Sequence, residues 1–186
     1  VLLSDATLGL NETQAQWAAD VSAGHIGRAR HLARDEAART KRATALKLPQ
    51  LVYEPNALYR FTAELVKKAE EEAASELEKL DQREREELES SLGVGAKGKG
   101  AAKAQRGASG RMKELEKEQK NRRTRRTRDS LDLALIDIAG LYRDAMLQAA
   151  GAMDGDGVPV GGHQHPDMAA TSKELARRNS ASALMS

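Results

Sequence analysis

The sequence predicts an all-α protein, and three observations carry this prediction. Alanine, leucine, glutamate, lysine and arginine dominate the 186 residues, which is a composition typical of helices. Apolar side chains recur at intervals of three and four residues, most clearly from Leu131 to Ala149. Aromatic residues make up only 3% of the chain and charged residues 31%. We therefore expect a thin core of alanine and leucine, and long helices with exposed charged faces.

Three short helices are predicted near the start of the chain, over about 12–22, 26–33 and 36–48. Asn11 and Gln14 have the spacing of a capping box, and Gly24 provides a stop for the first helix. Asp35 is the cap of the third helix, which is expected to end before Pro49. Helices this short bury too little surface to be stable alone, so they belong to a larger domain.

Two long helices with opposite charges are expected to follow. The first spans about 55–92 and carries eleven acids and five bases between 64 and 89. The glycine- and alanine-rich segment 93–110 has the composition of a flexible loop. The second helix is expected over 111–150, with its basic half first. Because acidic and basic faces attract, the charges predict an antiparallel helical hairpin over about 64–128.

The end of the chain is predicted to contain a loop and one more helix. The segment 151–167 is rich in glycine and includes two prolines, which favour a loop. A short helix is expected to begin at Thr171 or Ser172.

The apolar half of the second long helix is the main candidate for a contact with another subunit. Its stripe consists of Leu131, Leu135, Ile138, Tyr142, Ala145 and Ala149. Such a stripe is by base rate core within the chain. However, Leu133, Ile136, Leu141 and Leu147 lie off the stripe, and the rest of the chain has little surface to cover so broad an apolar helix. The candidate partner contacts are Leu131, Leu135, Ile138 and Tyr142.

The basic stretch 117–128 is the candidate for a nucleic-acid contact. From Gly93 to Arg128 there are thirteen cations and three acids, which is enough for phosphate contacts. Aromatic residues that could stack on bases are absent from this segment. The pattern favours neutralisation by the acidic helix or by solvent. An independent nucleic-acid-binding hairpin that uses Arg122, Arg123, Arg125, Arg126 and Arg128 is the alternative.

No catalytic, cofactor or metal site is predicted. The segment 93–99 has the glycine and lysine spacing of a phosphate-binding loop, but Gly100 replaces the required serine or threonine and no strand precedes it. No grouping of nucleophile, base and orienting residue stands out. His163 and His165 with Asp167 lack a second ligand cluster, so a surface loop is the default expectation for them.

The acidic pair Asp154 and Asp156 does not continue into a calcium loop, because the terminal glutamate is missing. The chain contains no cysteine, which excludes disulfides and cysteine-bound zinc within it. It also has no apolar run of the roughly 20 residues that a membrane span needs. These features lead us to expect a cytoplasmic protein without membrane contact.

Three segments in the same order resemble the AAA+ clamp-loader family, and within it the delta-prime subunits of bacterial DNA polymerase III. Ser22–Leu32, SAGHIGRARHL, resembles the lid helix of that family. Asp129–Met146, DSLDLALIDIAGLYRDAM, resembles a collar helix, and His165–Met168, HPDM, resembles the loop that follows it. The resemblance implies a partial lid subdomain over 1–34 and a C-terminally incomplete collar domain over 35–186, with the charged hairpin as an insertion.

The resemblance also implies a role without nucleotide hydrolysis. Family members that hydrolyse ATP place a γ-phosphate-sensing arginine three residues after the lid-helix glycine. Counted from Gly24, this position is Gly27, and Arg28 is one residue out of register, about 100° further round the helix. The implied function is that of a structural stator subunit, not itself an enzyme and without its own cofactor. It would help to load the sliding clamp on primed DNA.

The implied partners are the motor and delta subunits of the clamp loader, with DNA contacted only weakly or indirectly. An ATPase module with zinc-binding cysteines and an arginine finger is expected to precede Val1.

Overall fold

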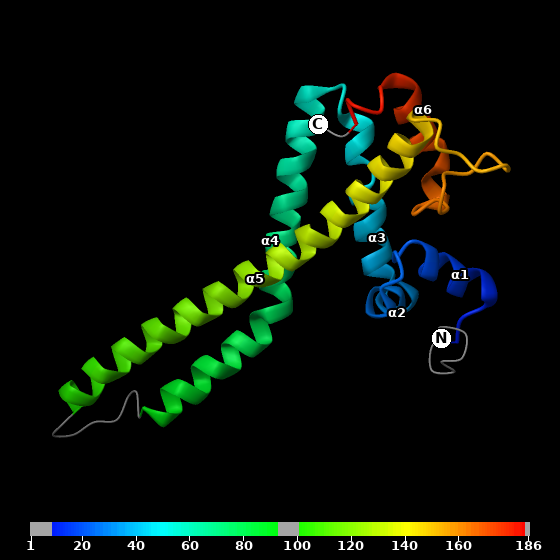
Figure 1. The fold of residues 1–186 in the computed structure, drawn as a ribbon. Helices are drawn as coiled ribbons and strands as arrows, with labels where there is room; N and C mark the ends of the chain where they lie inside the picture. The colour runs from blue at the N-terminus through cyan, green and yellow to red at the C-terminus, as the bar shows by residue number, and fades with distance from the viewer. Residues whose placement is uncertain (1–8, 93–100, 185–186) are drawn as a thin grey trace. The chain divides into compact units, whose positions relative to one another are not determined.

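The computed structural model describes residues 9–92 and 101–184, with side chains for 9–92 and 108–184, and the regular elements of this part of the chain are helices (Figure 1). The α-helices are α1 (Glu12–Asp20), α2 (Ile26–Arg34), α3 (Glu36–Ala45), α4 (Pro55–Ser91), α5 (Ala101–Ala149) and α6 (Ala169–Arg178). Short 3-10 helices cover Leu48–Leu51 and Pro166–Met168. The predicted all-α fold is confirmed. None of the described helices is both long and apolar enough to cross a membrane.

The predicted caps of the first helices are present. The Asn11 side chain accepts a hydrogen bond from the Gln14 amide at 2.8 Å, and the Gln14 side chain accepts one from the Asn11 amide at 3.2 Å. This pair completes the capping box. Asp35 accepts from the Ala37 amide at 2.8 Å at the start of α3. Gly24 lies in the turn between α1 and α2 with φ +80°, a conformation that glycine adopts without strain.

Three helix boundaries differ from the sequence prediction. α3 ends at Ala45, three residues earlier than expected, and Pro49 lies in a separate 3-10 helix. α5 begins at Ala101, ten residues earlier than expected, since the alanines of this segment favour helix strongly enough to accommodate Gly110. α6 begins at Ala169, where it continues from the preceding 3-10 helix. The glycine-rich segment 93–100, with its phosphate-loop spacing, lies outside the described residues.

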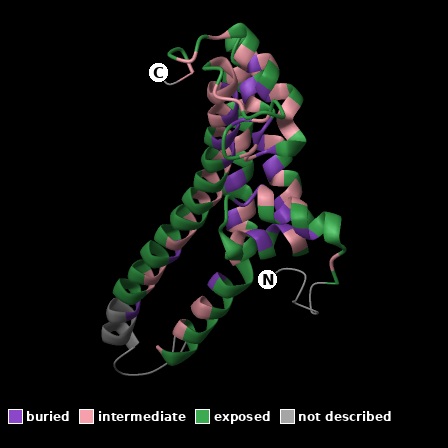
Figure 2. Cartoon of the chain, turned by 45° about the vertical axis from the view of Figure 1, so that its right-hand side comes forward, coloured by how far each residue is buried: buried purple, intermediate pink, exposed green. Residues whose placement is uncertain are grey.

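The chain forms two compact units, and helices α4 and α5 contribute residues to both. Unit 1 consists of Val1–Tyr59 and Leu133–Ser186, and unit 2 is Arg60–Asp132. In unit 1, small apolar side chains form clusters made of Ala15, Ala18 and Ala29, of Val21, Leu32 and Ala38, and of Leu46, Leu141, Ala145 and Leu175. Buried residues are spread over its helices in Figure 2. The expected alanine- and leucine-rich core is therefore present, while the division into lid and collar stays a prediction.

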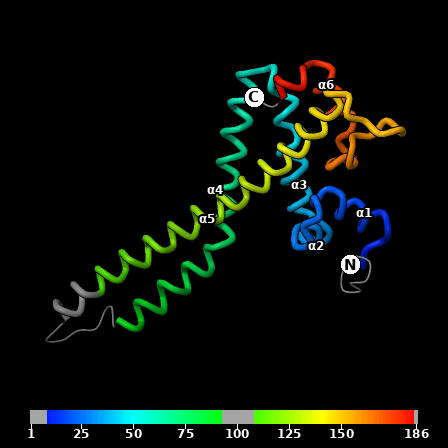
Figure 3. The backbone as a smooth tube through the Cα atoms, in the orientation of Figure 1, coloured from blue at the N-terminus to red at the C-terminus, as the bar shows by residue number. Residues whose placement is uncertain are grey.

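Unit 2 is the antiparallel helical hairpin that the charges predict (Figures 1 and 3). Arg126 Nε on α5 donates to Glu76 Oε2 on α4 at 2.6 Å. Further along the hairpin, Arg85 Nε on α4 donates to Gln119 Oε1 on α5 at 3.2 Å. Because the pairs advance along α4 while they retreat along α5, the two helices run in opposite directions.

The centre of the hairpin is polar. The carboxylate of Asp81 is 2% exposed and accepts hydrogen bonds from Arg122 Nη2 at 2.8 Å and from Arg123 Nε at 2.7 Å. Buried Gln119 donates to the Asp81 carbonyl oxygen at 2.9 Å. Arg122 also donates to Glu84, and this hydrogen bond lowers the pKa of the Glu84 carboxyl and raises that of the guanidinium. Side-chain ion pairs therefore fix the register of helices whose buried apolar residues are mainly alanine.

Replacing Asp81 with alanine should destabilise the hairpin, because Arg122 and Arg123 would lose their shared carboxylate. We expect a loss of about 2 kcal/mol in the free energy of unfolding. This is less than for a fully buried pair, because both arginines are partly exposed. Urea unfolding followed by circular dichroism measures the loss. Glu71→Ala is the matched control, since it removes only an exposed pair with Lys67 and should change the free energy by less than about 0.5 kcal/mol. Equal losses in the two variants would contradict a structural role for Asp81.

Candidate functional site

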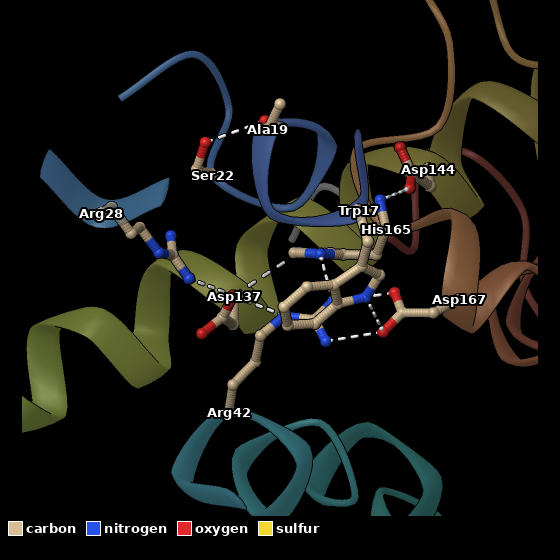
Figure 4. A network of polar contacts seen from close by, with 9 residues as sticks. All are labelled: Trp17, Ala19, Ser22, Arg28, Arg42, Asp137, Asp144, His165 and Asp167. Atoms are coloured by element: carbon tan, nitrogen blue, oxygen red, sulfur yellow. Dashed lines mark hydrogen bonds and ion pairs between the residues drawn. The ribbon is translucent and has the colours of Figure 1, made fainter. Parts of the chain in front are cut away.

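A cluster of ionisable side chains lies inside unit 1 and joins segments that are distant in the sequence (Figure 4). Its members are Arg28 of α2, Arg42 of α3, Asp137 and Asp144 of α5, and His165 and Asp167 from the segment before α6. We refer to these six residues as the buried charge cluster. Asp144 and His165 are fully buried. Ionisable groups at this depth are tolerated only when they are paired or hydrogen-bonded, so each contact in the cluster constrains the fold.

Asp137 is shared by two guanidinium groups. Arg28 Nη2 donates directly to its Oδ1, and Arg42 Nε lies 3.5 Å from the same atom. Burial raises the pKa of the Asp137 carboxyl, although both arginines act to lower it. The carboxylate therefore connects α2 and α3 to α5 through one oxygen atom (Figure 4).

Arg42 makes the largest number of contacts in the cluster. Its Nη1 and Nη2 donate to the two oxygens of Asp167 at 2.7 and 2.9 Å, which is a bidentate fork. Its Cζ lies 5.5 Å from the ring centroid of Trp17, and the indole Nε1 donates to Asp167 at 3.3 Å. Burial acts to raise the pKa of Asp167, but the hydrogen bond and charge of Arg42, with the bond from Trp17, outweigh it and lower that pKa.

His165 is held as a neutral ring. Its Nδ1 lies 2.9 Å from Arg42 Nη2, which can only donate, so Nδ1 accepts and the ring proton is assigned to Nε2. Burial and the charge of Arg42 lower the pKa of the imidazole to about 4. Nε2 lies 3.9 Å from Asp137 Oδ1. The histidine is thus a buried hydrogen-bond acceptor for the guanidinium.

Asp144 fixes the loop that carries the histidine. Its Oδ1 accepts from the amide of Gln164 at 3.0 Å, and its Oδ2 accepts from the amide of His165 at 2.9 Å. Asp137 and Asp144 are seven residues apart, so they share one face of α5. Gly140 lies between them on this face, where an added Cβ would be 2.6 Å from His165 Nε2. The loop can approach α5 so closely only because residue 140 has no side chain.

The buried face of α5 is not the apolar stripe that the sequence predicts. The buried face carries Asp137, Leu141, Asp144 and Ala145, about 100° round the helix from the centre of the predicted stripe. The expectation that this stripe is core is wrong for Leu135, which is 61% exposed, whereas Leu131, Ile138 and Tyr142 are half-buried. The rotation follows from the buried charge cluster, because both aspartates must face inward to meet their partners.

An apolar patch consequently remains exposed on α5 within unit 1. We refer to Leu135, Ile136 and Ala139 as the α5 apolar patch. Ile136 is 47% exposed, and Ala139 is also exposed. These positions lie within about 100° of arc on one side of the helix, opposite the buried charge cluster.

The five arginines of the basic stretch fall into two groups within unit 2. Arg122, Arg123 and Arg126 pair with acids of α4. Arg125 and Arg128 are exposed, and they make no ion pair with any residue that the structure describes. The predicted internal partner of the basic run is therefore present, but it engages only the inward-facing arginines.

The buried charge cluster is not predicted by the sequence pattern. The interpretation of His163, His165 and Asp167 as a surface loop is wrong for His165, which is fully buried, whereas Asp167 is exposed and pairs with Arg42. The sequence feature that could have indicated the cluster is the pair Asp137 and Asp144, because two acids seven residues apart in the most apolar part of α5 share one helix face. Among the side chains that the structure describes, those of 9–92 and 108–184, no group of three or more potential ligands could hold a metal ion.

Two other predicted positions have local roles. Asp154 Oδ1 accepts from the amides of Asp156 and Val158, which forms a tight turn within the loop. Gly27, the position that corresponds to the phosphate sensor, lies in the first turn of α2, after the N-cap His25.

Comparisons of the chain with protein-family models, with curated proteins and with solved structures give no match. Any assignment of function therefore depends on the residues themselves and on the resemblance of the three segments.

Substituting Gly140 with alanine should destabilise the protein by about 2 kcal/mol, because the new Cβ would overlap the His165 ring and the Gln164 side chain. The measurement is the free energy of unfolding in urea. Gly110→Ala is the control in the same helix, where an added Cβ meets nothing within 4 Å, and it should stabilise by about 1 kcal/mol. Stabilisation by both substitutions would show that the loop does not approach α5 closely.

The stability of the protein should decrease as the pH falls from 6.5 to about 4. In this window the unfolded chain protonates His165 at its ordinary pKa of 6.5, while the folded state resists protonation until about 4. The unfolded state binds more protons, so this residue should remove about 3 kcal/mol of stability over the window. Chemical unfolding at a series of pH values measures the slope. His165→Gln should remove this component, and the exposed control His31→Gln should retain it. A His165→Gln variant with the wild-type slope would refute the assignment.

Proposed function

We propose that this chain is the lid and collar region of a delta-prime-type subunit of a bacterial DNA polymerase III clamp loader. Its work would be subunit contact without ATP hydrolysis, in the complex that loads the sliding clamp on primed DNA. The proposal is supported by the order of the three segments Ser22–Leu32, Asp129–Met146 and His165–Met168 and by the all-α fold. All three segments supply residues to unit 1, and two of them, with α3, supply the charges that surround Asp137.

The observation that carries the proposal is the α5 apolar patch. Leu135 and Ile136 are about half exposed on a helix whose opposite face is anchored by buried ion pairs. Apolar surface buried against a partner contributes about 25 cal/mol per Å², so two such side chains on a rigid helix favour association. They also belong to the segment that resembles a collar helix, where subunit contact is the implied role.

The role of Arg28 supports a subunit that does not sense nucleotide. Its guanidinium donates to buried Asp137, and its side chain is only 9% exposed. An arginine that serves as a structural partner inside the fold is not available to a γ-phosphate. This use of Arg28 agrees with Gly27 at the position that corresponds to the sensor.

The alternative of a nucleic-acid-binding hairpin based on all five arginines has less support. Arg122, Arg123 and Arg126 are already paired with acids of α4. Binding of phosphates by these three side chains would require the hairpin to lose its own ion pairs.

The double substitution Leu135→Asp and Ile136→Asp should reduce association with a purified motor subunit at least tenfold, because charges would replace exposed apolar contacts. Pull-down or analytical ultracentrifugation of the 186-residue chain measures binding, and circular dichroism should show an unchanged helical fold. Val160→Asp is the matched control, since Val160 is 57% exposed in a loop of the same unit and should bind normally. The proposal fails if the wild-type chain binds neither motor nor delta subunits, or if the double variant binds as well as the wild type.

A further inference from the structure

Four exposed cations of unit 2 lie along one face of α5. Lys117, Lys120, Arg125 and Arg128 are exposed, and they make no ion pair within the described part of the chain. We refer to these four side chains as the outer basic face. The arginines that pair with α4 lie on the other side of the same helix. The basic run is thus divided into inner arginines, which acids of α4 neutralise, and the outer basic face, which forms no described ion pair.

The outer basic face is continuous. At about 100° per residue, its four cations fall within an arc of about 140°. They extend over eleven residue steps, which is about 16 Å of helix. Exposed Asn121 and Thr124 lie in the same arc and provide neutral hydrogen-bonding groups. Glu118 lies at the edge of the arc, and the arc ends one turn beyond Arg128, at the exposed acid Asp132.

The other helix of unit 2 exposes more acids than bases. Exposed acids of α4 include Glu70, Glu71, Glu78, Glu86 and Glu87. An anionic partner would be repelled by α4 and attracted by α5. The charge distribution therefore directs an anion to a single side of the hairpin.

We propose that the outer basic face binds the phosphate backbone of duplex DNA without sequence preference. Its length of about 16 Å matches about five phosphates of one strand, at 3.4 Å per nucleotide along the axis. Lysine, arginine, asparagine and threonine are the side chains that typically contact phosphates. The sequence from 62 to 132 contains no aromatic residue, so a platform on which single-stranded bases could stack is missing. This binding goes beyond subunit contact and uses residues of unit 2, so it can fail independently of the proposed assembly role.

The test is titration of the whole chain into a fluorescently labelled duplex of twenty base pairs, followed by anisotropy at several salt concentrations. Four phosphate contacts predict a slope of log K against log [salt] of about −3.6, or roughly a hundredfold loss between 50 and 200 mM salt. The variant Lys117→Gln, Lys120→Gln, Arg125→Gln and Arg128→Gln should lose at least tenfold in affinity at 50 mM salt, with a slope near zero. Circular dichroism should be unchanged, because none of the four makes a described ion pair.

The matched control is Lys67→Gln, Lys68→Gln, Lys79→Gln and Arg83→Gln, which removes the same charge from exposed positions of α4. It should retain binding within about threefold of the wild type. Equal losses in the two variants would show that net charge alone is responsible and would overturn the proposal. So would no binding at 50 mM salt, or tighter binding of a single-stranded oligonucleotide or of poly-glutamate than of the duplex.

Discussion

The way in which the helices of unit 1 meet depends on the ion pairs of the Asp137 carboxylate. A charge at 2% exposure is unfavourable unless it is paired, and here the partners are guanidinium groups of α2 and α3. Because the same Arg42 also holds Asp167 and His165, the segment before α6 is fixed to the same point. Alanine-rich helices offer little surface for shape-specific packing, and these directional contacts define how they meet.

Unit 2 applies the same principle in a simpler form. Two long helices with few buried apolar residues are aligned by Asp81 and its arginine partners. Ion pairs of this kind contribute modestly to stability, but each wrong register would leave a buried carboxylate or amide without its partner. The pairing consumes the inward-facing cations of α5 and leaves the outward-facing ones for other contacts.

The two units therefore present surfaces of different chemistry. Unit 1 exposes the α5 apolar patch, which suits association with another protein. Unit 2 exposes the outer basic face, which suits a polyanion. In both units, one face of α5 forms ion pairs within the chain, and the exposed surface lies on the opposite face. The internal ion pairs therefore determine which side chains of α5 remain available to partners.

The sequence by itself determined the helical class, the capping box at Asn11, the cap at Asp35 and the antiparallel hairpin, because these depend on local hydrogen bonds and on charge along each helix. It also indicated that α5 has more apolar surface than the chain can cover. Only the tertiary structure decided which face of α5 is buried, since the inward positions of Asp137 and Asp144 depend on Arg28, Arg42 and the His165 loop, which are far away in the sequence. The spacing of apolar residues contains no information about ion pairs between distant segments. The periodic pattern therefore predicted that Leu135 is core, whereas it is exposed.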